Sequence, residues 1–215
     1  MKTATSVSIF LSVILFVSVS NAQLAFKADL DGAQAGTPSA ATGTAILVYD
    51  PGFTSLNMII GFNGITTAQI TGFHIRQAPA GSVGPIVFGL VNPNNDPNNF
   101  ADLGTRYLAG WDPSDIAAGA MLDPTSIGVL VGLLNEDFYF NAETAAFPNG
   151  EIRGQIVRVL FGDVNLDGIK SLLDVPVFVG LLNGGRYQIE ADFNLNGVID
   201  NGDIPGFIAA IIFGC

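Results

Sequence analysis

The chain has 215 residues, of which 49% are hydrophobic and 13% are charged, with 26 glycines and a formal net charge of −11. This length allows one large domain and a small one, and the composition is typical of β-rich proteins with many turns. The acidic balance argues against nucleic acid and anionic membrane surfaces as partners, and it favours hard cations.

The first 22 residues have the pattern of a secretory signal peptide. Lys2 supplies the positive start, residues 9–19 form a short apolar core, and Ser20 and Ala22 are the small residues before a cut at Gln23. The apolar run is too short for a bilayer core, and the alternative is an uncleaved anchor. We therefore expect a secreted protein, extracellular or at the cell surface, with no membrane contact after cleavage.

Cys215, the last residue, is the only cysteine. It cannot form an intramolecular disulfide, so a core or a metal must stabilise this exported chain. Its role stays open between an incidental residue at a frayed end and a link between chains.

Residues 24–160 read as short strands separated by turns. "GTAILVYDPG" and "SLNMIIGFNG" are apolar runs that end in turn dipeptides, and "AQITGFHIRQ" alternates, with Phe73 and Ile75 on one face and His74 and Arg76 on the other. "GPIVFGLV", "DFYFNAET" and "GEIRGQIVRVL" continue the pattern, whereas "SIGVLVGLLN" fits a short helix or a strand. The fold class that we expect is mainly β, an antiparallel β-sandwich.

The acids of this region are scattered along the sequence, and no nucleophile motif, phosphate-binding loop or Cys/His cluster accompanies them. We therefore expect no enzyme, although paired carboxylates for glycoside cleavage stay open. Four of these acids are interpreted as turn and surface residues: Asp112, Asp115, Glu136 and Asp137.

From Gly162 onward the chain repeats itself. "DVNLDGIKSLLDVPVFVGLL" begins at Asp163, and "DFNLNGVIDNGDIPGFIAAI" begins at Asp192. The polar residues of the two copies coincide, and so do one glycine, one proline and one phenylalanine. Such agreement across the whole unit predicts a duplicated motif in a small unit over residues 162–215.

The spacing of the duplicated motif fits a calcium loop. Calcium takes about six to eight oxygen ligands, and a twelve-residue loop supplies them from positions 1, 3, 5, 7 (a backbone carbonyl), 9 and 12, with glycine at position 6. In the first loop the ligand positions are Asp163, Asn165, Asp167, Ile169, Ser171 and Asp174. In the second loop they are Asp192, Asn194, Asn196, Val198, Asp200 and Asp203. Each loop gathers three carboxylates that repel one another without a cation, so we predict two bound Ca²⁺ ions.

Both loops end in aspartate, which is one methylene shorter than the glutamate that closes an EF-hand loop. Each loop must then draw closer to the ion or coordinate it differently. The alternative is an Asx-turn loop that holds no metal.

A pair of such loops, each followed by one helix and without the preceding helix of an EF-hand, resembles a dockerin type I domain. The resemblance covers residue 162 to about residue 213 and implies EF-hand-like calcium binding, with helices that start near Asp174 and Asp203. A proline in the first turn of each segment fits a helix start. Two apolar stripes would pack on one another: Val175, Phe178, Val179 and Leu182, and Ile204, Phe207, Ile208 and Ile211.

Dockerins bind cohesin domains, in the best-known cases to assemble polysaccharide-degrading complexes, through loop positions 10 and 11, often a hydroxyl pair. This chain has Leu172 and Leu173 there in the first loop and Asn201 and Gly202 in the second. The resemblance therefore implies a cohesin-like partner, while a different partner or simple capping within the chain stays open.

The β-rich region resembles the CHRD domain, named for its repeats in chordin. The resemblance rests on "GFHIRQAPAGSVGPIVFGL" and "FYFNAETAAFPNGEIRGQI" and spans residues 24–160. It implies a β-sandwich similar to that of copper–zinc superoxide dismutase. Together the two resemblances indicate a secreted protein of a bacterial type.

Family members carry a second histidine on the His-Ile-His strand, where this chain has Arg76. They carry another histidine before a threonine of the last strands, where this chain has Glu143 before Thr144. His74 is the only histidine, and one imidazole cannot build a redox copper or catalytic zinc centre. We therefore expect a hydrogen-bonded structural residue. Arg76, Glu143, Glu151 and Arg153 are expected to form a charged cluster on one sheet face.

The leading hypothesis is an exported, non-enzymatic, calcium-binding interaction or adhesion protein, whose sandwich is tethered to a partner by the dockerin-like unit. Extracellular polysaccharide or matrix is a second class of partner. One alternative is an accessory subunit or enzyme of an extracellular polysaccharide-degrading assembly, and another gives the unit a purely structural role.

Overall fold

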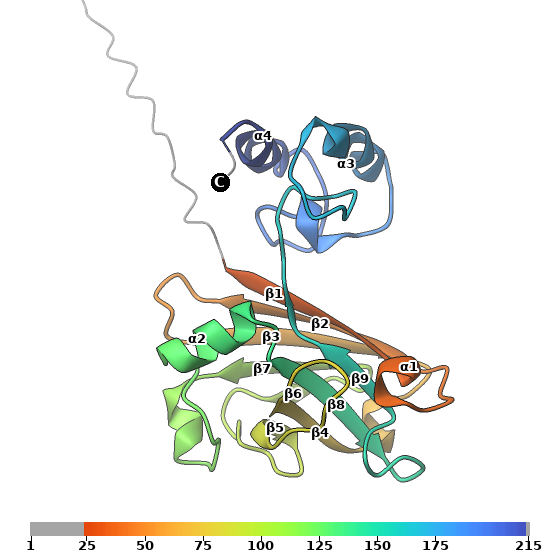
Figure 1. Ribbon diagram of the computed structural model, residues 1–215, viewed down its shortest axis with the longest axis vertical. Helices are drawn as coiled ribbons and strands as arrows, with labels where there is room; N and C mark the ends of the chain where they lie inside the picture. The colour runs from red at the N-terminus through yellow and green to blue at the C-terminus, as the bar shows by residue number, and fades with distance from the viewer. Residues whose placement is uncertain (1–23, 214–215) are drawn as a thin grey trace, which may run out of the picture.

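The computed structural model describes residues 24–213 of the chain. The predicted leader, residues 1–22, and Cys215 lie outside the described residues. The described chain has a β-rich part and, beyond its last strand, a smaller part that carries two helices (Figure 1).

Ten strands form one antiparallel sheet in the order β5-β4-β8-β9-β1-β2-β3-β7-β6, with β10 paired to β1. The first five strands are β1 (Ala25–Asp31), β2 (Thr42–Tyr49), β3 (Leu56–Asn63), β4 (Ile70–Gln77) and β5 (Ile86–Val91). The others are β6 (Ala101–Asp102), β7 (Arg106–Trp111), β8 (Phe138–Thr144), β9 (Ile152–Gln155) and β10 (Val157–Arg158).

The sheet curls until its two ends face one another across a single apolar core. Phe88 of β5 stacks on Trp111 of β7 with 4.9 Å between ring centroids, although these strands lie near opposite ends of the strand order. Phe62 of β3 meets Phe73 of β4 edge to face at 5.4 Å. The prediction of a mainly β, antiparallel fold is confirmed, and the two facing layers belong to one continuous sheet.

The helices of the β-rich part are short. Helix α1 (Gly32–Ala35) follows β1, and the apolar run that fitted either a helix or a strand is helix α2 (Ile127–Leu134). Its start is set by Ser126, whose hydroxyl accepts a hydrogen bond from the N–H of Val129, and Val129 and Leu133 enter the core.

Asp115 is buried, so its interpretation as a surface residue is wrong. It lies in a 3-10 turn (Pro113–Ile116) and is 2% exposed, because its carboxylate turns inward to accept a hydrogen bond from the N–H of Asp112 at 2.8 Å. Burial, together with the charges of Asp96 and Asp112, raises the pKa of Asp115 to about 6.

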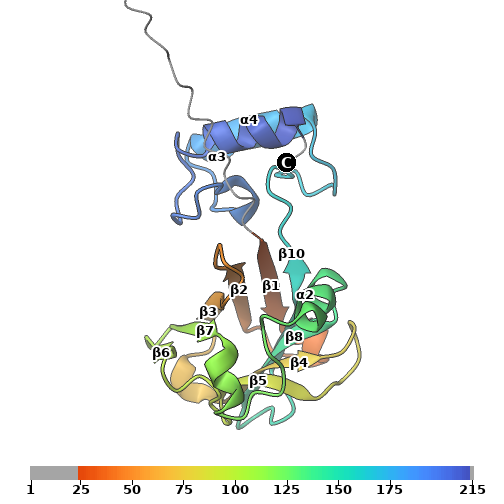
Figure 2. The same ribbon diagram turned by 90° about the vertical axis from the view of Figure 1, so that its left-hand side faces the viewer.

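The smaller part holds helices α3 (Val175–Leu182) and α4 (Ile204–Phe213), which lie side by side in Figure 1 and overlap in the turned view of Figure 2. Each begins one residue after the aspartate near which the sequence predicts a helix. The rings of Phe178 and Phe207 stack at 3.9 Å between centroids and form the centre of a small core.

The predicted apolar stripes are only partly correct. Leu182 and Ile211 pack against the small core, but Val175, Val179 and Ile208 are 37%, 47% and 49% exposed. Because the two short helices contact one another along a narrow stripe, Val175, Val179 and Ile208 lie outside the contact and face solvent. Within residues 24–213, no helix is long and apolar enough to cross a membrane.

The stacked ring pair generates a stability prediction. Phe207→Ala should lower the free energy of unfolding by about 3 to 5 kcal/mol, which is comparable to the whole stability that so small a core can supply. Phe213→Ala on the same helix is the matched control, because Phe213 is 76% exposed. In hydrogen-exchange measurements with calcium present, we expect α3 and α4 to lose amide protection in Phe207→Ala and to keep it in Phe213→Ala. Equal protection in the two variants would refute this description of the core.

Candidate functional site

The two loops bury the carboxylates that open and close them. Asp163 and Asp174 of the first loop are 5% and 0% exposed, and Asp192 and Asp203 of the second loop are both 0% exposed. Aspartate is almost never fully buried unless a partner or a metal compensates the charge. Each loop therefore concentrates buried negative charge within twelve residues.

Backbone N–H groups orient the opening carboxylate of each loop in the same way. In the first loop Asp163 accepts hydrogen bonds from the N–H groups of Asp167 at 3.0 Å and Gly168 at 2.9 Å. In the second loop Asp192 accepts from Asn196 at 3.1 Å and Gly197 at 2.8 Å. The duplicated sequence thus produces a duplicated geometry.

The closing carboxylates are held equally alike. Asp174 accepts from the N–H groups of Asn165 at 3.0 Å and Ser171 at 2.7 Å. Asp203 accepts from Asn194 at 3.2 Å and Asp200 at 2.9 Å. These bonds connect the closing aspartate of each loop to the backbone of the predicted ligands at positions 3 and 9.

The loop turn relies on backbone with positive φ. Leu166 and Leu195 have φ of 61° and 53°, and the glycines that follow, Gly168 and Gly197, both have φ of 84°. A glycine adopts this conformation without strain. The prediction of a glycine turn at position 6 is confirmed in both loops.

The remaining predicted ligands lie nearer the surface. Asn165 and Ser171 are half-buried and the others are exposed: Asp167, Ile169, Asn194, Asn196, Val198 and Asp200. Ser171 caps a 3-10 turn through its hydroxyl, which accepts from the N–H of Leu173 at 3.1 Å.

The donor set is the one that calcium prefers, since each loop mixes carboxylate, amide or hydroxyl, and carbonyl oxygens. A carboxylate oxygen that accepts one N–H bond still has a lone pair for a cation. In the part of the chain that the structure describes, however, no three His, Cys, Asp or Glu side chains form a metal-binding group. Two-site calcium binding therefore stays a prediction.

The second loop has a polar neighbour that the sequence analysis missed. The hydroxyl of Tyr187 donates a hydrogen bond to Asp192 Oδ2 at 2.9 Å. Burial and this bond raise the pKa of Tyr187, so its hydroxyl stays protonated and able to donate. No signal in the sequence links these residues, because the first loop has no equivalent tyrosine.

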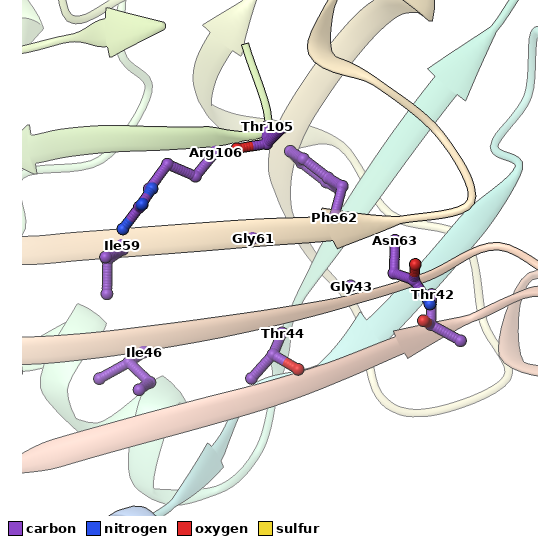
Figure 3. A pocket seen from close by; sticks show the side chains of 10 residues that line it. All are labelled: Thr42, Gly43, Thr44, Ile46, Ile59, Gly61, Phe62, Asn63, Thr105 and Arg106. Atoms are coloured by element: carbon purple, nitrogen blue, oxygen red, sulfur yellow. The ribbon is translucent and has the colours of Figure 1, made fainter. Parts of the chain in front are cut away.

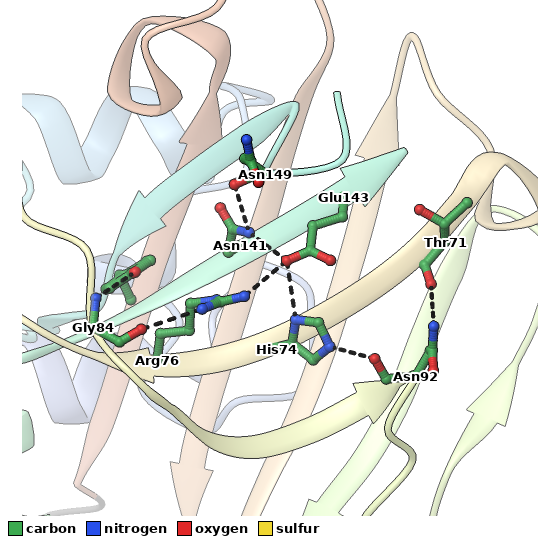
Figure 4. A network of polar contacts seen from close by, with 9 residues as sticks. Thr71, His74, Arg76, Gly84, Asn92, Asn141, Glu143 and Asn149 are labelled. Carbon is green, nitrogen blue, oxygen red and sulfur yellow. Dashed lines mark hydrogen bonds and ion pairs between the residues drawn. The ribbon is translucent and has the colours of Figure 1, made fainter. Parts of the chain in front are cut away.

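The lone histidine is buried in a polar network on β4 (Figure 4). His74 is 1% exposed, and its Nε2 lies 2.8 Å from the carbonyl oxygen of Asn92, so Nε2 carries the hydrogen. Nδ1 lies 3.5 Å from Glu143 Oε1 and has no hydrogen-bond partner among the described atoms. Burial is the main cause that lowers the pKa of His74, so the ring is neutral at pH 7.

The predicted charged cluster on this face is wrong for two of its four members. Arg76 and Glu143 form an ion pair at 2.9 Å, as expected. Glu151 instead accepts hydrogen bonds from the hydroxyls of Ser39 and Thr144, and Arg153 donates to the carbonyl of Ser82 and lies over the Tyr139 ring at 3.5 Å. Both are buried, and their partners lie in neighbouring loops and on β8.

A shallow pocket of about 440 Å³ lies on the outer face of β2 and β3, where Arg106 extends over the sheet toward Ile59 (Figure 3). Arg106 is the charged residue among those that line it, and none of them is Asp, Glu, His or Cys. The pocket is thus a polar and aliphatic surface without an acid–base pair in its lining.

The buried histidine generates a pH prediction. Folding lowers the pKa of His74 below its usual value near 6.5, so this group's contribution to stability is present above that pH and is lost as the pH falls toward the folded pKa. NMR titration of the single histidine should give a pKa below 6.5. Glu143→Gln should lower it further, since the Glu143 charge favours the protonated ring. A pKa at or above 6.5 would contradict the burial described here.

Comparison with known proteins identifies the β-rich part. The CHRD domain model matches residues 26–156, and no curated protein and no solved structure matches the chain. The matched segment runs from β1 to the end of β9, so it covers the curled sheet and stops before the loops. This chain therefore belongs to the CHRD domain family.

Proposed function

We propose that this chain is an exported, non-enzymatic, calcium-binding protein that holds its CHRD domain on a partner through the two C-terminal loops. The observation that carries the proposal is the repeated burial of an opening and a closing aspartate in each loop, at 0% to 5% exposure. Burying several carboxylates in so short a segment is costly unless a cation compensates them.

Two Ca²⁺ ions would satisfy both loops. The first ion would take oxygens from Asp163, Asn165, Asp167, Ser171 and Asp174 and the carbonyl of Ile169. The second would take oxygens from Asp192, Asn194, Asn196, Asp200 and Asp203 and the carbonyl of Val198. Bound calcium would supply positive charge, and the chain supplies a loop whose closing aspartate is already bonded to the backbone N–H of the ligand at position 3.

The tethering role is supported by the resemblance of this unit to a dockerin and by the surface beside the first loop. Leu172 and Leu173 occupy the dockerin recognition positions and are 76% and 71% exposed. Contiguous exposed apolar surface is typical of interaction sites. The partner is thus a cohesin-like protein domain whose contact surface is apolar. Such a surface would differ from that of a cohesin that binds a pair of hydroxyl side chains.

Calorimetry tests the calcium sites. The full chain without its leader should bind two ions, and Asp163→Asn or Asp192→Asn should each weaken one site by about tenfold or more, because ligand charge sets affinity. Asp29→Asn on β1 is the control, with the same charge change on an exposed residue outside the loops. Calcium at a hundred times its Kd should add about 2.7 kcal/mol of stability. Absence of binding in the unsubstituted chain would refute the proposal.

Partner capture tests the tether. The chain is immobilised and exposed to the native secretome in calcium or in EGTA, and captured proteins are identified by mass spectrometry. We expect a partner that is retained only in calcium and is lost with the paired substitution Leu172→Ser and Leu173→Ser. Asn201→Ser, at the equivalent position of the second loop, should retain it. If the same proteins are captured in calcium and in EGTA, and by the unsubstituted chain and the leucine variant, the result would count against tethering.

A further inference from the structure

The smaller part is packed directly on the sheet. Strand β10 pairs with β1, and Leu160 and Phe161 lead straight into the first loop. Lys27 of β1 donates a hydrogen bond to Glu190 at 2.6 Å, and the Glu190 side chain is only 4% exposed. Ile189 beside it is buried in a cluster with Ala25 of β1 and Val159. Buried charge pairing plus apolar contact indicates a specific docked arrangement.

The two loops differ in what they touch. Leu195 at position 4 of the second loop is half-buried and packs against the cluster formed with β1, together with Ile46 and Val48 of β2. Leu166, its equivalent in the first loop, is 59% exposed. The same residue at the same loop position, with the same backbone conformation, is thus an interface residue in only one copy.

The second loop also borders a cleft against the sheet. This cleft of about 500 Å³ is lined by Ile46, Met58 and Ile59 of the sheet on one side and by Tyr187, Leu195 and Asn196 on the other. Asn196 is a predicted calcium ligand, and Tyr187 donates to Asp192, the first ligand of the loop. The conformation of the second loop and the shape of this cleft therefore depend on the same residues.

We propose that the second loop is also a latch between the two parts, so that calcium bound there holds the smaller part against β1 and β2. The first loop meets the docked segment through its backbone, where the carbonyl of Val164 accepts a hydrogen bond from Gln188, and its calcium serves mainly that part's own fold. This inference rests on the proposed calcium binding. Without the ion, Asp192, Asp200 and Asp203 repel, and loop opening moves Leu195 and the adjoining 3-10 turn (Ile189–Ala191) off the sheet. By linkage, docking strengthens calcium binding at the second loop by the same factor.

Small-angle scattering and calorimetry on the full chain without its leader test the latch. The matched variants are Leu195→Asn and Leu166→Asn, since asparagine tolerates the positive φ of both positions. Lys27→Met breaks the interface from the sheet side, without changing a residue of either loop. We expect a compact particle in calcium and a larger radius of gyration in EGTA for the unsubstituted chain and for Leu166→Asn. Leu195→Asn and Lys27→Met should give the larger radius even in calcium.

Calorimetry separates the latch from calcium binding itself. Leu195→Asn and Lys27→Met should still bind two ions, with one site weakened by about fivefold or more, while Leu166→Asn should match the unsubstituted chain. Two bound ions with identical scattering in calcium and EGTA would overturn the latch and leave the calcium sites standing. Equal behaviour of the two leucine variants would overturn it as well. Absence of calcium binding would overturn both proposals.

Discussion

The burial of four aspartates in two short loops is the constraint on which the smaller, C-terminal part of this architecture depends. A buried carboxylate costs several kcal/mol unless it is compensated, and each of the four accepts two backbone N–H bonds. The same bonds set the geometry around them: the left-handed turns at Leu166 and Leu195, and helices that begin directly after Asp174 and Asp203. The stacked pair of Phe178 and Phe207 then joins the two copies into one unit. Calcium is the cation whose ligand preferences fit this arrangement.

The CHRD domain is stabilised in a different way. Its curled sheet closes over an aromatic core, where stacking between Phe88 and Trp111 joins distant strands. The core of this domain is apolar and aromatic, whereas the smaller part also buries four aspartates. The two parts meet at β1, where Lys27 pairs with Glu190. At this interface Leu195 of the second loop packs against the cluster that includes Ala25, whereas Leu166 of the first loop is exposed.

Local patterns in the sequence predicted most of the fold. The remaining features depend on contacts between residues that lie far apart in the sequence. Alternation predicted the strands, and the repeat from Asp163 to Asp192 predicted both loops and the starts of both helices. No local pattern could reveal that Lys27 pairs with a residue 163 positions away, or that Leu195 is packed while Leu166 is exposed. The inward turn of Asp115 and the exposure of Val179 and Ile208 likewise depend on tertiary packing, which overrides periodicity in short elements.

The most direct test of the central claim uses Tyr187 as a built-in reporter. Tb³⁺ replaces Ca²⁺ at oxygen-rich sites, and a tyrosine whose hydroxyl bonds to Asp192 lies close enough to sensitise its emission. Excitation of the tyrosine should produce terbium luminescence, and this luminescence should fall when excess calcium displaces the terbium. Tyr187→Phe, which lacks the hydroxyl bond, should reduce the luminescence although terbium still binds. If terbium gives no sensitised emission from the unsubstituted chain, or if excess calcium fails to displace it, the buried aspartates do not form a calcium site and the account is wrong.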